Sequence, residues 1–460
     1  MTVPGTTAAK PIPVRKQLVY SLSELGSNPI YTITLSFLTF FYTDVMGVNA
    51  GVVGIVILIS RLFDGFSDIW AGNIIDHTHA KSGSARPWLL WTAVPLALSY
   101  VALFTVPNWS EAGKVIYIFV SYNFAMTLVF TFFNSGINAL PIYMTDDTKS
   151  RSSAYAIRLI VAGLVQAVLS YVFMNVIDAL GGDQTAWIKF AAVLGTISFA
   201  ACLIAYAGTR EHVASAAASS GKDVKLRDAL KSTIHNKYWF MVLGIILILV
   251  LHQISTLTVG VYYAKYILRD ETLTGSLVLY HHMGGAVGML IMPFLLQKGF
   301  SKRTATLIGG FLMLGGSLLS LYSCEGAFLI VSLAMRGCGF GVVSSTYLGM
   351  LADTVDYGEW KNGVRNPAVT TCAGTFGQKL GSGLGTALFG LALSAVGYDG
   401  LAAAQPESAI VCIRLMFTIL PAILYAALIA LAFAYKLDKE YPAIMKDLEA
   451  RHAAAAGKAE

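Results

Sequence analysis

Two carboxylates stand out in one of the most apolar stretches of the chain. Asp64 and Asp68 lie in RLFDGFSDIWAG, residues 61–72, directly after the apolar run GVVGIVILIS. On a helix, residues four apart lie on one face, so the two carboxylates would be held about one turn apart. Carboxylates this close repel, and one of them tends to keep a proton unless a cation lies between them. Together with the hydroxyl of Ser67, the pair predicts a small site for Na⁺, Li⁺ or a proton.

Arg61 offers a second interpretation of the same stretch. It lies three residues before Asp64 and therefore shares its helix face. A purely structural ion pair between Arg61 and Asp64 is the alternative to a cation site. That pair would leave Asp68 unexplained, so we favour the cation site and keep the ion pair as the alternative.

The composition indicates which elements position these acids. Of the 460 residues, 56% are hydrophobic and only 13% are charged, whereas a soluble domain has about 25% charged residues. About 20 apolar residues suffice for a helix to cross a bilayer. The sequence predicts an all-α polytopic membrane protein with twelve transmembrane helices, at residues 18–43, 51–76, 87–107, 114–143, 153–177, 186–208, 237–267, 274–297, 304–323, 326–352, 367–396 and 408–435.

A long polar stretch between the sixth and seventh predicted helices divides the chain. This segment, GTREHVASAAASSGKDVKLRDALKSTIHNK, is basic and rich in Ala and Ser. We interpret it as a cytoplasmic linker between two six-helix halves. The predicted parts are the first bundle at 1–208, the linker at 209–236, the second bundle at 237–435 and a cytoplasmic tail at 436–460.

Loop charge supports this topology. Alternate loops, beginning with the N-terminal segment, contain nearly all of the loop Lys and Arg residues, whereas the opposite loops contain only Lys114 and Arg269. The positive-inside rule then places both termini in the cytoplasm, and we expect the helices to lie in the inner membrane of a bacterium. The net charge of +6 reflects this topology, and the basic residues form no single patch that would predict nucleic-acid binding.

The sequence offers little support for an enzyme. A membrane-embedded transferase would need a catalytic His, Cys or Asp cluster at a membrane face, and no such pattern is visible. The five cysteines are scattered without metal-binding spacing, so we expect no cofactor, and no metal beyond the possible coupling ion Na⁺. The expected partners are a small molecule and the lipid bilayer, and we expect a monomer.

Charged residues also gather at the cytoplasmic ends of the predicted helices. Two lie around the loop after the second helix, and four lie around the tenth and eleventh helices. We predict that they form a cytoplasmic gate of ion pairs between the halves, with solvated loop charge as the alternative. These residues are Asp76, Arg86, Asp353, Asp356, Glu359 and Arg365.

Three long segments together resemble one known family. They are RLFDGFSDIWAGNIIDHTHAKSGSARPWLLW at 61–91, LADTVDYGEWKNGVRNPAVTTCAGTFGQKLGSGLG at 351–385, and ELGSNPIYTITLSFLTFFYTDVMGV at 24–48. They resemble the second helix and its loop, the tenth and eleventh helices, and the first helix of the glycoside–pentoside–hexuronide:cation symporters. That family belongs to the major facilitator superfamily, and the resemblance covers essentially the whole chain.

The resemblance implies a cation site. The two acids that build this site in the family match Asp64 and Asp68, and a hydroxyl on the fourth helix matches Thr131. A lysine on the eleventh helix that couples charge near the site matches Lys379. The residue before the second acid is often Asn in Na⁺-using members and is Ser67 here, which leaves H⁺ open as the coupling ion.

The resemblance also implies a substrate site. The arginine of the fifth helix matches Arg158, and Thr375 lies one turn before the matched lysine. In melibiose permease, a member of the family, two aspartates hold the sugar, and their positions are Asn28 and Asn134 here. Glu24 occupies an acidic position of the pentoside and hexuronide branch.

These matches predict the transport function. The resemblance implies a symporter that couples Na⁺ or H⁺ to a sugar or glycoside by alternating access. Because two carboxylates of the sugar site are replaced by Asn while Arg158 and Lys379 keep their positive charge, we expect a uronide or a pentoside rather than a galactoside. Transport of a lysolipid or another amphiphile is the alternative.

Overall fold

The structure is a computed structural model that describes residues 11–78, 80–145, 147–211, 232–322, 326–363 and 367–456. Within these residues the secondary structure is helical, apart from one isolated β-bridge between Ala80 and Gly83. The chain forms two compact units that do not follow chain order throughout. Unit 1 contains residues 1–220, 264–276 and 386–410, and unit 2 contains residues 221–263, 277–385 and 411–460.

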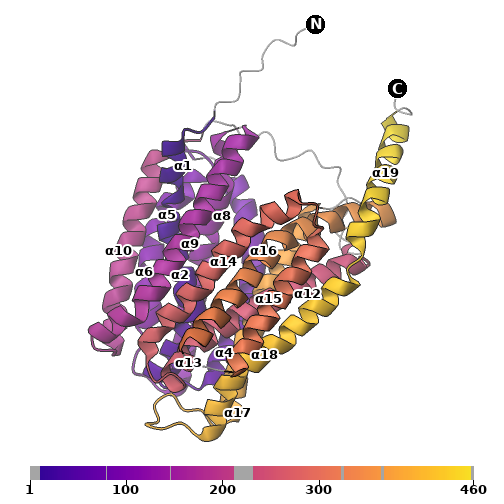
Figure 1. Ribbon diagram of the computed structural model, residues 1–460. Coiled ribbons are helices and arrows are strands. Elements are labelled where there is room, and N and C mark those ends of the chain that lie inside the picture. Colours follow the sequence, from indigo (N-terminus) through magenta and orange to yellow (C-terminus); the bar gives the residue numbers. More distant parts are fainter. Residues whose placement is uncertain are drawn as a thin grey trace. The chain divides into compact units, whose positions relative to one another are not determined.

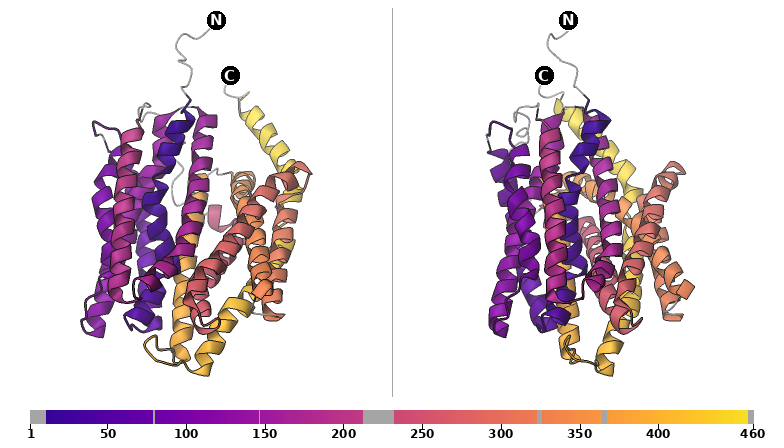
Figure 2. Two further views of the ribbon diagram at one scale, coloured as in Figure 1. Left: turned by 60° about the vertical axis from the view of Figure 1, so that its left-hand side comes forward. Right: turned by 90° about the vertical axis from the view of Figure 1, so that its left-hand side faces the viewer.

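The first ten α-helices belong to unit 1, and the long ones run side by side (Figures 1 and 2). Two π-helical segments, η1 and η2, interrupt them. Their bounds are α1 Val14–Ser21, α2 Glu24–Ser36, α3 Leu38–Phe40, η1 Phe41–Val45, α4 Ala50–Asp76, α5 Arg86–Trp91, α6 Ala93–Phe104, α7 Glu111–Tyr122, η2 Asn123–Phe130, α8 Thr131–Met144, α9 Thr148–Ala179 and α10 Gln184–Gly208.

The remaining helices lie mostly in unit 2, but α13 and α17 begin in unit 2 and end in unit 1, α14 and α18 begin in unit 1, and η4 lies within unit 1. Their bounds are α12 Lys237–Gln253, η3 Ile254–Thr258, α13 Val259–Tyr266, η4 Glu271–Leu273, α14 Thr274–Gln297, α15 Lys302–Tyr322, α16 Gly326–Asn362, α17 Pro367–Ala395, α18 Glu407–Ala434 and α19 Leu437–Ala456.

Nine helical segments of the described chain are long and apolar enough to cross a membrane. They overlap nine of the predicted helices, which are the second at 51–76, the fourth to the tenth between 114 and 352, and the twelfth at 408–435. The other three predictions coincide with α1 to η1, with α5 and α6, and with α17. The first of these is interrupted at Leu22–Ser23 and at Phe37, and the second at Thr92, so neither forms one long helix.

A tyrosine hydroxyl opens the backbone ladder of α2. Tyr100 donates to the carbonyl of Gly26 at 2.9 Å and accepts from the amide of Ile30 at 3.0 Å. These two groups would normally bond to each other across one helical turn, and Pro29 lies between them. An inserted hydroxyl of this kind is one of the recognised causes of a helix bend. It acts on the turn that contains Asn28, close to Glu24.

Glycines bring the central helices of unit 2 into close contact. A Cβ at Gly284 would lie 2.1 Å from the carbonyl oxygen of Ala334, and one at Gly337 would lie 1.9 Å from the carbonyl oxygen of His281. Helices α14 and α16 therefore pack backbone against backbone. Small residues at helix contacts are the usual means of close packing in membrane proteins.

Candidate functional site

A buried ion pair joins α2 and α9 in unit 1. The Nε of Arg158 donates to Oε1 of Glu24, and both side chains are buried. Breaking a buried pair by removing one partner leaves a charge without compensation, which is strongly destabilising. This pair therefore fixes the two helices relative to each other and provides one charged anchor for the polar groups around it.

Amide and hydroxyl groups complete this cluster. Arg158 donates to Oδ1 of Asn138 at 2.6 Å and to Oδ1 of Asn134 at 3.2 Å. Asn28 donates to Oε2 of Glu24 at 3.3 Å. Asn28 and Asn134 are half-buried and Asn138 is exposed, so the amides border accessible space. The structure thus brings together the four residues that the resemblance assigned to the substrate on these helices.

Sequence reasoning missed two members of the cluster. Asn138 lies four residues after Asn134, and Tyr20 lies four residues before Glu24; the Tyr20 hydroxyl accepts a 3.3 Å bond from Arg158. The i,i+4 spacing places Asn138 on the same face of α8 as Asn134, and this was the signal that could have found it. Tyr20 lies on α1, before the interruption at Leu22–Ser23, so helix spacing does not connect it to Glu24.

The pairing changes the charge that the site offers to a substrate. We expected Arg158 to keep its positive charge in the site, which would favour an anionic sugar. The structure pairs the guanidinium with Glu24, and the preference for a uronide or a pentoside stays a prediction. The sequence argument counted the two missing carboxylates of the sugar site but did not pair Glu24 with Arg158, since the two lie 134 residues apart.

Asp64 is the centre of a second polar cluster in unit 1. Its Oδ2 accepts from Arg61 at 3.3 Å, so the ion pair kept as the alternative is formed. Its Oδ1 accepts from the Thr131 hydroxyl at 3.0 Å. The Ser67 hydroxyl lies 3.4 Å from that of Thr131. Asp64, Arg61 and Thr131 are all buried, whereas Ser67 is half-buried.

The π-helical segment η2 positions Thr131 in this cluster. Thr131 begins α8 directly after η2, and its hydroxyl also donates to the carbonyl of Met126, five residues earlier, at 3.1 Å. π-Helical turns inside α-helices occur frequently at functional sites, because the wider turn redirects the side chains that follow. The result is that carboxylate and hydroxyl oxygens, the ligands that hard cations prefer, gather beside Asp64.

Two further residues assigned to the cation, Asp68 and Lys379, and one assigned to the substrate, Thr375, are less closely defined. Asp68 is half-buried and lies one turn after Asp64 on α4. Lys379 is half-buried and Thr375 is exposed; both lie in the part of α17 that belongs to unit 2. The roles of all three remain predictions.

Three residues of the expected cytoplasmic gate, Arg86, Asp353 and Asp356, bond to partners within their own units. Arg86 donates to the carbonyl of Tyr206 at 3.0 Å and stacks on its ring at 4.1 Å, inside unit 1. In unit 2, Asp353 pairs with Lys302 at 2.6 Å, and Asp356 accepts from the Tyr441 hydroxyl at 2.7 Å.

The other three residues of the expected gate are Glu359, Asp76 and Arg365. Glu359 is half-buried on α16, and Asp76 is the last residue of α4. Arg365 lies outside the described residues. Pairing of these charges between the halves therefore stays a prediction, and Lys302 is a partner that sequence reasoning did not identify.

Unit 2 contains a buried arginine that is held by neutral groups. Arg336 donates to the carbonyl of Phe417 and to the hydroxyl of Thr256, each at 3.2 Å, and lies over the Phe417 ring. These contacts connect α16, α18 and η3. They explain Arg336 as part of the packing of the bundle rather than as part of a binding site.

The fold defines a class of protein. Two solved structures share it across nearly the whole chain. One is a bacterial homolog of the human lysosomal transporter Spinster, with a TM-score of 0.66, 11% identity and coverage of 94% of this chain and 97% of that chain. The other is the nucleoside transporter NupG, with a TM-score of 0.63, 16% identity and coverage of 92% and 99%. The protein is therefore an all-α, multi-pass membrane protein with the major facilitator fold.

The sequence comparisons identify the family. The sequence model for the family described as MFS/sugar transport protein matches residues 19–439. The chain belongs to this family, which confirms the resemblance found in the sequence, and it is a transporter rather than an enzyme.

Several relatives match over nearly their whole length. The isoprimeverose transporter of Lactiplantibacillus pentosus is 33% identical over 96% of this chain and 92% of its own. The putative glycoside/cation symporter YagG of Escherichia coli is 28% identical over 97% of each chain. The glucuronide carrier protein homolog of Escherichia coli is 29% identical over 94% of each chain.

Proposed function

We propose that this protein is a bacterial inner-membrane symporter that couples a monovalent cation, Na⁺ or H⁺, to the uptake of an uncharged sugar or glycoside. Pentose-containing glycosides are the favoured substrates. Both termini face the cytoplasm. The proposal joins the two polar clusters of unit 1, one suited to a cation and the other to a hydroxyl-rich molecule.

The Asp64 cluster is the observation that carries the coupling. A buried carboxylate inside a membrane helix is costly and is usually functional. Here it faces the hydroxyl of Thr131 at 3.0 Å, with the Ser67 hydroxyl close by and Asp68 one turn away. Arg61 already compensates one negative charge. The second acid, Asp68, therefore gives the site the charge that a monovalent cation or a proton would neutralise.

The Glu24–Arg158 cluster supports a neutral substrate. Its charges cancel, while Asn28, Asn134 and Asn138 present amide groups toward accessible space. Ligand sites typically use a few polar groups of this kind to fix orientation and give specificity. The names of the isoprimeverose transporter and the glycoside/cation symporter among the relatives support the same substrate class.

Alternating access gives the two clusters a common mechanism. In this fold, one bundle rocks against the other around a binding site near the middle of the membrane. A cation and a sugar can shift this equilibrium only by binding one conformation better than the other. We propose that Lys379, near Thr375 on α17, acts as a charge partner of the cation site, and that Lys379→Leu uncouples transport without unfolding the protein.

The test is uptake into proteoliposomes with an imposed gradient. Purified protein is reconstituted, and labelled isoprimeverose and a xyloside are offered with an inward Na⁺ gradient, an inward H⁺ gradient or neither. We expect accumulation above equilibrium with one of the two gradients. Uptake that does not respond to either gradient would contradict symport. A lysolipid arm tests the amphiphile alternative.

A uronide is the second candidate substrate, because the glucuronide carrier homolog is among the relatives. Competition separates the two candidates. An unlabelled glucuronide that competes more strongly than isoprimeverose or a xyloside would show that the neutral Glu24–Arg158 pair does not exclude an anion. Melibiose serves as the galactoside control.

A further inference from the structure

A buried carboxylate at the end of the first predicted span has partners from distant parts of the chain. Asp44 lies in η1, and its side chain is 1% exposed. Its Oδ1 accepts from the Lys265 ammonium and the Tyr266 hydroxyl, both at 2.7 Å. Its Oδ2 accepts from the Tyr398 hydroxyl at 2.6 Å and from the Thr43 hydroxyl at 2.7 Å. We name Asp44, Lys265, Tyr266 and Tyr398 the outer latch.

The donors of the outer latch lie on elements that cross between the units in sequence. Lys265 and Tyr266 end α13, and Tyr398 follows α17. Both helices begin in unit 2, but their last residues, from 264 and from 386, belong to unit 1. The outer latch is therefore a principal polar attachment of these two helix ends to the N-terminal helices.

Small residues surround this attachment. A Cβ at Gly54 of α4 would lie 2.8 Å from Cα of Ala387, and a Cβ at Gly390 would lie 2.2 Å from the carbonyl oxygen of Ala50. The end of α17 thus meets the start of α4 through backbone rather than interlocked side chains. Surfaces of this kind can close tightly, and they can also separate without freeing a buried side chain.

We propose that the outer latch locks an extracellular gate formed by the ends of α13 and α17 and the N-terminal helices. Asp44 positions these helix ends, and its bonds form when the gate closes and break when it opens. The inference rests on the proposed transport function and on the predicted topology, which places the ends of the first, seventh and eleventh spans outside. Opening would return the Asp44 carboxylate to water, whereas breaking the pair without opening would leave this buried carboxylate without its counter-charge. A partly open gate is therefore unfavourable.

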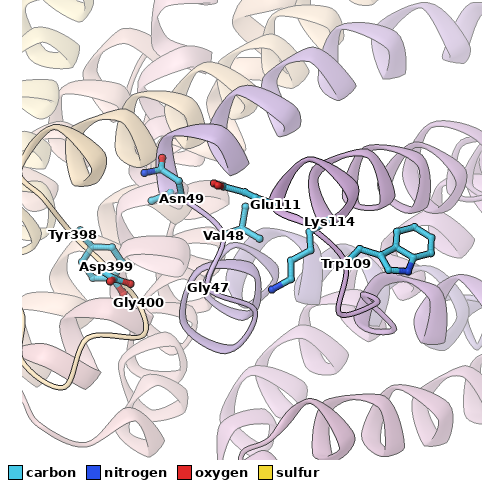
Figure 3. Close-up of a pocket in the computed structure, with 10 residues that line it drawn as sticks. Gly47, Val48, Asn49, Trp109, Glu111, Lys114, Tyr398, Asp399 and Gly400 are labelled. Carbon is cyan, nitrogen blue, oxygen red and sulfur yellow. The ribbon is translucent and has the colours of Figure 1, made fainter.

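A cavity lies beside Tyr398 of the outer latch (Figure 3). It has a volume of about 410 Å³, and Tyr398 contributes to its lining. The figure shows Glu111 directed toward Asn49, and Lys114 donates to the carbonyl of Met46 at 2.9 Å. Because Tyr398 touches both the cavity and the Asp44 carboxylate, we expect its hydroxyl to be the first donor released when the gate opens.

Chemical labelling tests the gate without a substrate. The five native cysteines are replaced by Ser, and one cysteine is introduced at Ala387, which is 3% exposed beneath Gly54. A membrane-impermeant maleimide is added outside intact cells, and the labelling rate is measured. A cysteine at the exposed Ala395 serves as a reference for reagent access.

Asp44→Asn should raise the labelling rate at position 387 by about tenfold, the factor that corresponds to loss of one bond to a charged group. Tyr398→Phe should give a smaller rise. Lys265→Arg keeps the positive charge beside Asp44 and should leave the labelling rate nearly unchanged. Asp399→Asn removes the neighbouring exposed carboxylate and should change nothing. Equal rates in Asp44→Asn and Asp399→Asn would overturn the proposal. If Asp44→Asn does not fold, Tyr398→Phe and its comparison with Asp399→Asn carry the test.

Transport kinetics separate a gate from a merely structural bond. A weakened outer latch populates the outward-open state, so KM for external sugar should fall, while Vmax falls because closure is less favourable. A structural defect would lower Vmax alone. Faster labelling without any sugar uptake would support the gate and contradict the proposed function. Normal uptake with unchanged labelling would contradict the gate only.

Discussion

Asp44 and Asp64 are both buried carboxylates of unit 1, and each pairs with a positively charged side chain. The positions of their partners in the sequence differ. Arg61 lies three residues from Asp64 on the same helix, and Thr131 lies on a neighbouring helix of the same bundle. The partners of Asp44 lie 221 residues away at Lys265 and 354 residues away at Tyr398.

This difference indicates what each site can do. A pair within one helix keeps its geometry while helices move as rigid bodies, so Asp64 would respond to cation binding rather than to helix movement. A pair between distant segments can be made or broken by the same motion. Asp44 is therefore suited to report conformation, and Asp64 to report ligand.

The largest effect is expected at the proposed cation site. Asp64→Asn and Asp68→Asn should each abolish gradient-driven sugar accumulation, because the site loses the charge that the cation neutralises. The measurement is the accumulation ratio in proteoliposomes. Labelling at position 387 should stay unchanged in both variants, since the outer latch does not share these residues. Accumulation at the original level in either variant would contradict the assignment.

Glu24 tests whether a pair between helices of one bundle is structural. Glu24→Gln leaves the buried Arg158 without a counter-charge and should destabilise the protein by about 3–5 kcal/mol. Thermal unfolding in detergent measures this. Adding Arg158→Met should recover part of the loss, because both charges are then removed. Equal unfolding temperatures for the single variant and the original protein would show that Arg158 is compensated by other groups.

A substitution at Thr131 tests the contribution of one hydroxyl to the proposed cation site. Thr131→Val removes the hydroxyl that donates to Asp64 at 3.0 Å. The Thr131 oxygen is also a proposed ligand of the cation, and losing a contact to a charged group costs about 1.5–3 kcal/mol, so the cation concentration for half-maximal transport should rise about tenfold to hundredfold. Thr127→Val is the matched control, because Thr127 donates to Asn123 instead. A similar effect of both substitutions would argue against a role specific to Asp64.

The smallest effect is expected where α4 meets α17. Gly54→Ala places a methyl group 2.8 Å from Cα of Ala387 and should cost about 1–3 kcal/mol through overpacking. Gly72→Ala on the same helix has open space at its Cβ and should cost less. The unfolding temperatures of the two variants provide the check, and a larger loss for Gly72→Ala would contradict the close contact.

Much of the fold could be predicted from the sequence because membrane helices are local in origin. The apolar stretch predicted at 274–297 coincides with α14, and the one predicted at 186–208 differs from α10 by two residues at its start. The bilayer core offers no hydrogen-bond partners, so a spanning segment satisfies most of its backbone polar groups within its own helix. Length and hydropathy therefore suffice for most spans, and the i,i+3 spacing of Arg61 and Asp64 anticipated their pair.

Only the tertiary structure decided which charges meet across the chain. Glu24 neutralises Arg158, and Asp44 receives its donors from Lys265 and Tyr398, although no spacing rule connects these residues. The π-helical segment before Thr131 is equally invisible in the sequence, since it depends on packing rather than on propensity. A helix determines its own face from local spacing, but the partner of that face is set by packing, and the charge of each site follows from the partner.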